Sequence, residues 1–172
     1  MSAFPEGLQS TRFPPRLHDI EVCRSNLTAL PDGLASVWTA EMNLVFEFTQ
    51  FELFPRVLTR VRPSSLSLAG NRVDELPRAV LENQRLFFLV LNGNPLRALP
   101  TNVTLSPRLF WISIAHTLVA ELPSEYEGLR IDAGDSPLCA RDQEPPDVDC
   151  SSVDTDTMSM YPIELEETLN GT

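Results

Sequence analysis

The chain has 172 residues, the size of one domain, and 42% of them are apolar, enough for a hydrophobic core. Its formal net charge of −11 argues against a nucleic-acid-binding protein, because such a protein needs a basic face. All 13 positive charges are arginines, which excludes mechanisms that require a lysine, and two histidines are too few for a multi-histidine metal site. We expect no catalytic residues, no cofactor and no metal in this chain.

Residues 1–16 precede the regular part of the chain. Phe4-Pro5 followed by Leu8 has the same "apolar-Pro, then apolar at plus three" spacing that recurs later in the sequence. The segment is either an incomplete preceding repeat or an irregular N-terminal cap, and the sequence leaves both readings open.

Five similar segments follow between Leu17 and Pro123. The clearest is 86–100, where the apolar residues, an asparagine and a proline have the spacing LxxLxLxxNxLxxLP. The prolines that close the five segments stand at 31, 55, 77, 100 and 123, so they are 24, 22, 23 and 23 residues apart. Each segment predicts a short strand, then a turn, then a return stretch. The return at 78–84 is the one expected to form a helical turn, and the others should be looser.

This repeat resembles the leucine-rich repeat of the LPxx type. The resemblance implies an α/β solenoid, a right-handed superhelix with a concave parallel β-sheet and short helical, 3₁₀ or irregular convex returns. Residues 17–139 would form the array, with five repeats and a shortened sixth, since 131–138 overlays 89–96 position for position. Residues 140–172 are rich in Asp and Glu and are expected to form a disordered acidic tail.

One turn position in each repeat carries a polar side chain. The residues there are Ser25, Thr49, Asn71, Asn94, Thr117 and Ser136. Asparagine offers an acceptor and two donors, whereas Ser and Thr offer one hydroxyl. We therefore expect this buried polar ladder to be well hydrogen-bonded in the middle of the array and weaker toward both ends.

Cys139 and Cys150 are eleven residues apart, just beyond the last repeat. We predict that they form a disulfide that closes the array, the alternative being two unrelated thiols in a reducing compartment. Cys23 has no partner that the sequence suggests. Candidate N-glycosylation sites are Asn26 and Asn102, of which Asn102 should lie on the exposed return side.

Strand residues that alternate with the buried leucines should face the concave side of the sheet. The predicted partner-binding residues on that face are Phe48, Phe88, Val90, Asn92, Trp111, Ser113 and His116. Exposed aromatic residues beside small ones indicate a binding patch. Alternatively, Phe88 and Trp111 lie flat over neighbouring strands, or the register is off by one. His116 is interpreted as a polar contact, because the sequence places no carboxylate beside it.

The resemblance implies a non-enzymatic module that binds a protein or peptide, and we expect it to be part of a cell-surface recognition protein, exposed outside the cell. One alternative is an intracellular signalling scaffold of the small-GTPase-binding type, supported by the absence of a signal-peptide-like start and by Cys23. Another is the substrate-recognition part of a larger enzyme, such as a ubiquitin ligase or kinase. No membrane insertion is expected, because the longest apolar run, 86–91, is six residues, against about 20 needed to cross a bilayer.

Overall fold

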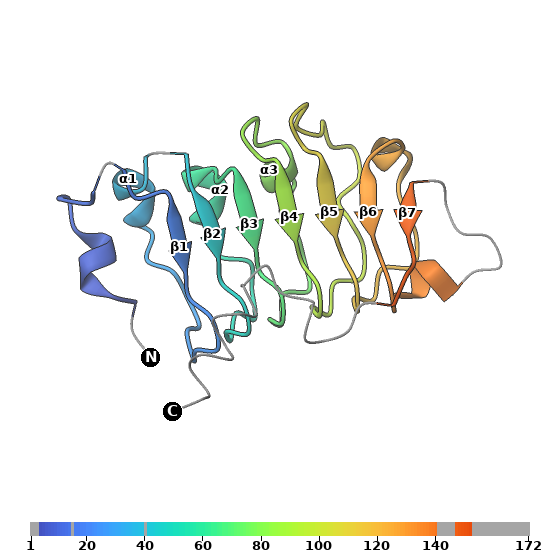
Figure 1. Ribbon diagram of the computed structural model, residues 1–172, viewed down its shortest axis with the longest axis horizontal. Coiled ribbons are helices and arrows are strands. Elements are labelled where there is room, and N and C mark those ends of the chain that lie inside the picture. The colour runs from blue at the N-terminus through green and yellow to red at the C-terminus, as the bar shows by residue number, and fades with distance from the viewer. Residues whose placement is uncertain (1–3, 15, 40, 141–146, 153–172) are drawn as a thin grey trace.

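The computed structural model describes residues 4–14, 16–39, 41–140 and 147–152. Within them the chain winds as a coil and lays its strands side by side in one parallel sheet, in the order in which they occur (Figure 1). The strands are β1 (Asp19–Glu21), β2 (Asn43–Val45), β3 (Ser65–Ser67), β4 (Phe88–Val90), β5 (Trp111–Ser113), β6 (Arg130–Asp132) and β7 (Val148–Asp149).

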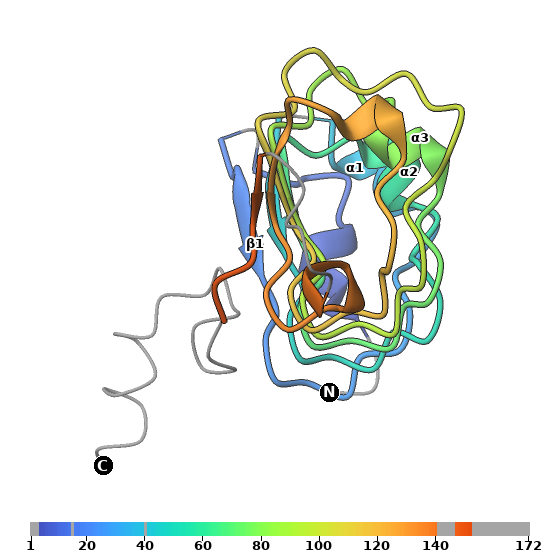
Figure 2. The ribbon, with the colours of Figure 1, turned by 90° about the vertical axis from the view of Figure 1, so that its right-hand side faces the viewer.

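The return segments lie on the other side of the coil from the sheet, as the view along the solenoid shows (Figure 2). They carry α1 (Leu34–Val37), α2 (Leu58–Val61), α3 (Arg78–Leu81) and the 3₁₀ turn η2 (Ser124–Tyr126); the 3₁₀ turns η1 (Glu6–Gln9) and η3 (Pro137–Ala140) lie near the two ends of the array. The helical turn expected within 78–84 is α3. Looser returns were expected at α1 and α2, and there the prediction is wrong, because both turns bury a leucine in the core, Leu34 or Leu58.

The core is a row of stacked apolar side chains. The central residues of six adjacent strands pair in register and are at most 4% exposed; they are Ile20, Leu44, Leu66, Leu89, Ile112 and Ile131. Two residues further on, Leu68, Leu91 and Ile114 are also buried, and their N–H groups continue the backbone ladder to the next strand. The predicted stacking of leucines in adjacent parallel strands is confirmed.

The polar ladder is strongest in the middle of the array, as predicted. The Asn71 side-chain amide donates to the carbonyls of Phe46, Leu68 and Ala69, and its oxygen accepts from the backbone N–H of Phe51 and the Thr49 hydroxyl. Asn94 makes four comparable bonds. Toward the C-terminal end, the Ser136 hydroxyl donates only to the carbonyl of Ala133, at 2.6 Å. The ladder supplies partners for backbone groups that the strands and turns leave over.

Residues 4–13 cover the first layer of the core. The rings of Phe4 and Phe13 lie 5.7 and 6.3 Å from that of Trp38, centroid to centroid. The buried Trp38 indole N–H donates to the carbonyl of Leu8 at 2.9 Å. Residues 4–14 contain no strand. They therefore shield the apolar end of the array without extending its sheet.

The other end is closed by β7, which lies inside the segment expected to be a disordered tail. The N–H groups of Ile131 and Ala133 donate to the carbonyls of Asp147 and Asp149, at 3.2 and 2.8 Å. For residues 147–152 the disorder prediction is wrong, because β6 offers unpaired backbone groups that this segment satisfies. Residues 141–146 and 153–172 of the predicted tail lie outside the described residues.

Candidate partner-binding site

Three of the predicted concave-face residues are buried. Val90, Asn92 and Ser113 are 1%, 4% and 2% exposed, so the prediction that they present side chains to a partner is wrong. The side-chain oxygen Oδ1 of Asn92 accepts from the Ser113 hydroxyl and the Ala115 N–H, at 2.8 and 2.9 Å. These two polar side chains therefore tie β4 to β5, and Val90 lies in register between neighbouring strands that enclose it laterally.

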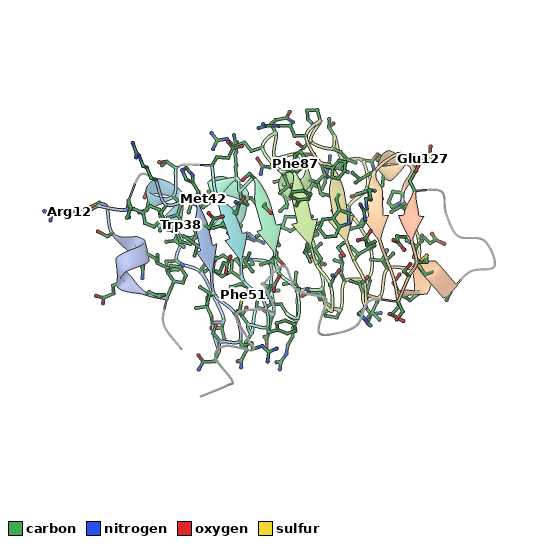
Figure 3. All side chains as sticks on the ribbon, in the orientation of Figure 1. Arg12, Trp38, Met42, Phe51, Phe87 and Glu127 are labelled. Atoms are coloured by element: carbon green, nitrogen blue, oxygen red, sulfur yellow. A yellow bond between two sulfur atoms is a disulfide. The ribbon has the colours of Figure 1, made fainter. Side chains whose placement is uncertain are left out.

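Where β4 and β5 begin, four aromatic rings are in contact, and we call them the aromatic edge: Phe87, Phe88, Phe110 and Trp111. Phe87 stacks on Phe110 with centroids 5.7 Å apart and 16° between the rings. Phe88 meets the edge of Trp111 at 5.9 Å and 77°. Phe87 and Phe110 are 41% and 53% exposed, and Phe88 and Trp111 are partly buried. Figure 3 shows Phe87 at the edge where the strands begin, opposite Phe51.

The sequence builds this edge by repeating one short pattern. Arg85-Leu86-Phe87-Phe88 is followed 23 residues later by Arg108-Leu109-Phe110-Trp111. In each copy the leucine is buried, at 0% or 9% exposure. The Phe110 N–H donates to the Phe87 carbonyl at 3.0 Å, which aligns the two copies. The leucine anchors each segment in the core, so its neighbours are held at the surface.

Phe87 and Phe110 were missed by sequence reasoning, which considered strand positions only. The signal that would have found them is the in-phase recurrence of an arginine, a leucine and two aromatic residues. Because the coil repeats every 23 residues here, residues 87 and 110 had to become neighbours.

Phe48 and His116 lie at the other end of the strands. Asn43 of β2 is in register with Phe88 and Trp111, and Phe48 and His116 follow Asn43 and Trp111 by five residues, about 16 Å along a strand. They belong to a row of residues with left-handed backbone, one in each of six coils: Arg24, Phe48, Gly70, Gly93, His116 and Asp135, with φ between 49° and 65°. Four of the six are not glycine, and each of these carries a backbone strain of about 1 kcal/mol. The predicted patch is thus two separate groups, and Phe48 makes no ring contact with the aromatic edge among the described residues.

A carboxylate lies beside His116, contrary to the expectation from sequence. Its Nε2 is 3.5 Å from Oδ2 of Asp135, which also accepts from the Ser152 hydroxyl at 2.8 Å. Asp135 occupies in the sixth coil the position that His116 occupies in the fifth. The contact becomes an ion pair when the imidazole is protonated.

The cysteines and the glycosylation candidates lie away from the aromatic edge. Cys139 and Cys150 are joined by a disulfide that links η3 to the residue directly after β7, and Cys23 is partly buried just after β1. Asn26 and Asn102 are both exposed, and the Asn102 N–H donates to the Glu125 carboxylate at 2.7 Å.

A shallow groove of about 430 Å³ lies outside the sheet, and its lining includes Leu53, Phe54, Leu76 and Pro77. Leu53 is 77% exposed, and Phe54 is the single aromatic residue among the described residues that line this groove. Across the described residues, no group of three or more His, Cys, Asp or Glu side chains is placed to hold a metal ion. Nor does that part of the chain contain a helix of the length and apolar character that a bilayer span requires.

No protein-family model and no curated protein matches the sequence. The structure is similar to that of a leucine-rich-repeat protein of Leptospira interrogans, with a TM-score of 0.67 and 20% sequence identity. The likeness covers 78% of this chain and 35% of that one, so this chain spans about a third of its length. At this identity the likeness shows the fold alone, which is a leucine-rich-repeat solenoid with a parallel sheet.

Proposed function

We propose that this leucine-rich-repeat solenoid is a non-enzymatic module that binds a protein or peptide through its aromatic edge. The observation that carries the proposal is the contact of four rings, two of them more than 40% exposed, at one edge of the sheet. Aromatic side chains are enriched at protein–protein interfaces, where a few well-packed residues carry most of the binding energy. Contiguous exposed apolar side chains on a folded protein mark sites that a partner covers.

The rings are also held in place before a partner arrives. Phe88 and Trp111 are strand residues paired in register, and the backbone of Phe87 is bonded to Ser64 at 2.7 Å. A surface that is already ordered loses little conformational freedom on binding. The edge therefore suits recognition better than the exposed leucines elsewhere, such as Leu53.

The test is selection of short peptides from a random displayed library on the immobilised full chain, followed by affinity measurement of the selected sequences. Phe87→Ala/Phe110→Ala should weaken binding at least about tenfold with little change in melting temperature, because both rings are exposed. The control is Leu53→Ala/Leu118→Ala, which removes two exposed leucines at 77% and 44% exposure. Equal losses in both variants would contradict the proposed surface.

We further propose that the module works outside the cell, as part of a cell-surface or secreted recognition protein. The Cys139–Cys150 disulfide and the exposed Asn26 and Asn102 support this. Non-reducing mass spectrometry of the protein from its native source should find no thiol at these two cysteines, and glycosidase treatment should lower its mass. Two reduced thiols with function intact in reducing buffer would favour the intracellular scaffold instead.

A further inference from the structure

We propose that the partner of the aromatic edge is an acidic peptide segment, one in which Asp or Glu residues flank apolar side chains. This inference rests on the proposed function and adds the chemistry of the ligand. It is carried by a row of arginines beside the rings, which we call the arginine row: Arg62, Arg85 and Arg108.

The three arginines are in phase with the coil. Each stands three residues before the first residue of its strand, and successive members are 23 residues apart. Residues one period apart stack on neighbouring coils, whose backbones lie about 4.8 Å apart. All three are exposed. The row thus runs along the same edge as the rings, with Phe87 and Phe110 two residues after Arg85 and Arg108.

The local charge opposes that of the whole chain. The segments 62–65, 85–88 and 108–111 contain three arginines and no Asp or Glu, whereas the residue at the same position in the next coil is Glu127, so the positive stretch covers three coils of a chain of net charge −11. Arg108 forms an exposed ion pair with Glu41 at 3.4 Å. Arg62 and Arg85 form no ion pair within the described ranges. Stacked like charges repel one another, and an anionic partner would relieve that repulsion.

The combination of rings and guanidinium groups selects the kind of anion. Guanidinium groups bind carboxylates through paired hydrogen bonds, and the rings offer apolar contact beside them. A nucleic acid would meet the same groups, but its dense charge would be repelled by the −11 of the whole molecule beyond the immediate edge. A short peptide bound at the edge would keep its few carboxylates within about one Debye length of the arginine row, roughly 8–10 Å at physiological salt. It would therefore be attracted by the arginines while the acidic residues elsewhere on the protein are screened.

The experiment uses the same displayed library and the full chain. The selected peptides should be net acidic and contain aromatic or aliphatic residues. Arg62→Gln/Arg85→Gln/Arg108→Gln should lower the affinity for the selected peptides about tenfold. The affinity of this variant should also fall less than that of the wild type when the salt concentration is raised from about 50 to 500 mM. The matched control is Arg56→Gln/Arg72→Gln/Arg97→Gln, which removes the same charge from exposed arginines outside the edge and should change affinity much less.

The outcomes separate the two proposals. Neutral or basic peptides that still depend on Phe87 and Phe110 overturn the acidic ligand and leave the proposed function standing. Peptides that bind independently of both phenylalanines overturn the proposed function.

Two other occupants are tested with the full chain. Charge removal at 153–172, by Asp154→Asn, Asp156→Asn and Glu164, Glu166 and Glu167→Gln, should leave peptide affinity unchanged. A rise of about tenfold in peptide affinity would mean that the chain's own acidic segment occupies the edge, and it would overturn the proposal. A dimer that is lost in Phe87→Ala/Phe110→Ala would assign the edge to a second copy, with the same consequence.

Discussion

The ring of Phe48 lies against the backbone of Gly70, so close that a Cβ atom on residue 70 would be 2.4 Å from Cδ1 of the ring. Both residues have left-handed backbone, with φ of 50° and 65°. On its other side Phe48 is covered by the Arg24 guanidinium, 5.7 Å from the ring centroid. A large side chain is therefore accommodated at the end of β2 because the next coil carries none at the same position.

Replacing Gly70 should destabilise the protein by more than the cost of a left-handed backbone at a non-glycine residue, because the new side chain would also clash with Phe48. We expect Gly70→Ala to lower the free energy of unfolding by about 2–3 kcal/mol, from left-handed strain together with the clash against Phe48. Gly128→Ala is the control, because Gly128 also has a positive φ, 78°, but open space around its Cα. It should cost only about 1 kcal/mol by urea denaturation, and equal costs would show that the ring contact is unimportant.

The polar ladder predicts a gradient of mutational cost along the array. Asn71→Ala leaves the Phe46 carbonyl and the Phe51 N–H without their partner, whereas the Leu68 and Ala69 carbonyls still accept from Asn94 and Phe48; the loss should cost about 4 kcal/mol. Thr117→Val removes a hydroxyl that donates to the Ile114 carbonyl at 2.7 Å and accepts weakly from the Val119 N–H at 3.5 Å, and should cost about 1–2 kcal/mol. Urea denaturation of both variants measures the difference. A cost for Thr117→Val that matched that of Asn71→Ala would contradict the gradient.

The two tryptophans should respond differently to the same substitution. The Trp38 indole N–H donates to Leu8, whereas that of Trp111 is buried without a hydrogen-bond partner among the described residues. Trp38→Phe should therefore cost about 2–3 kcal/mol, and Trp111→Phe less than about 1 kcal/mol. Thermal or urea unfolding of the pair provides the comparison. The expectation fails if Trp111→Phe proves the more damaging variant.

The disulfide should hold β7 against the sheet. Cys139→Ser/Cys150→Ser should speed hydrogen exchange at the amides of Ile131 and Ala133, which bond to residues beside and within β7. Closing a loop of eleven residues stabilises by about 2–3 kcal/mol, so exchange should rise by about thirtyfold or more. Reduced wild-type protein serves as the control and should match the variant. Unchanged exchange in both would mean that backbone pairing alone holds β7.

Alkaline pH should destabilise the protein through Tyr126. Burial raises the pKa of this phenol above its ordinary value of about 10, the Glu125 carboxylate adds to the rise, and its hydroxyl donates to the Pro100 carbonyl at 2.9 Å. A raised folded-state pKa gives stability that is fully present below about pH 10 and is lost as the pH climbs above it. Few other groups titrate there, because the chain has no lysine.

The variant Tyr126→Phe isolates this effect. It should be about 1 kcal/mol less stable at neutral pH, through loss of the hydrogen bond, yet lose less stability than wild type between about pH 10 and 12. Urea denaturation at a series of pH values measures both. Parallel decline of the two proteins above pH 10 would rule Tyr126 out as the cause.

The fold was determined by the sequence to a large extent, because each coil repeats the same local pattern. Leu66, Leu89 and Ile112 have the same place in their repeats, and burying them requires that they stack in neighbouring strands. The spacing of apolar residues therefore fixed the register without knowledge of distant contacts. The same regularity foretold the polar ladder through Asn71 and Asn94.

The candidate site was decided by the tertiary structure. Alternation showed which side chains point away from the core, but not which of them neighbouring coils would cover, so Val90 and Ser113 were misjudged. The pairing of His116 with Asp135, and of Phe48 with Gly70, arises between adjacent coils, where left-handed turns redirect the side chains. Exposure and contact depend on lateral neighbours about 20 residues away, and a pattern within one repeat contains no information about them.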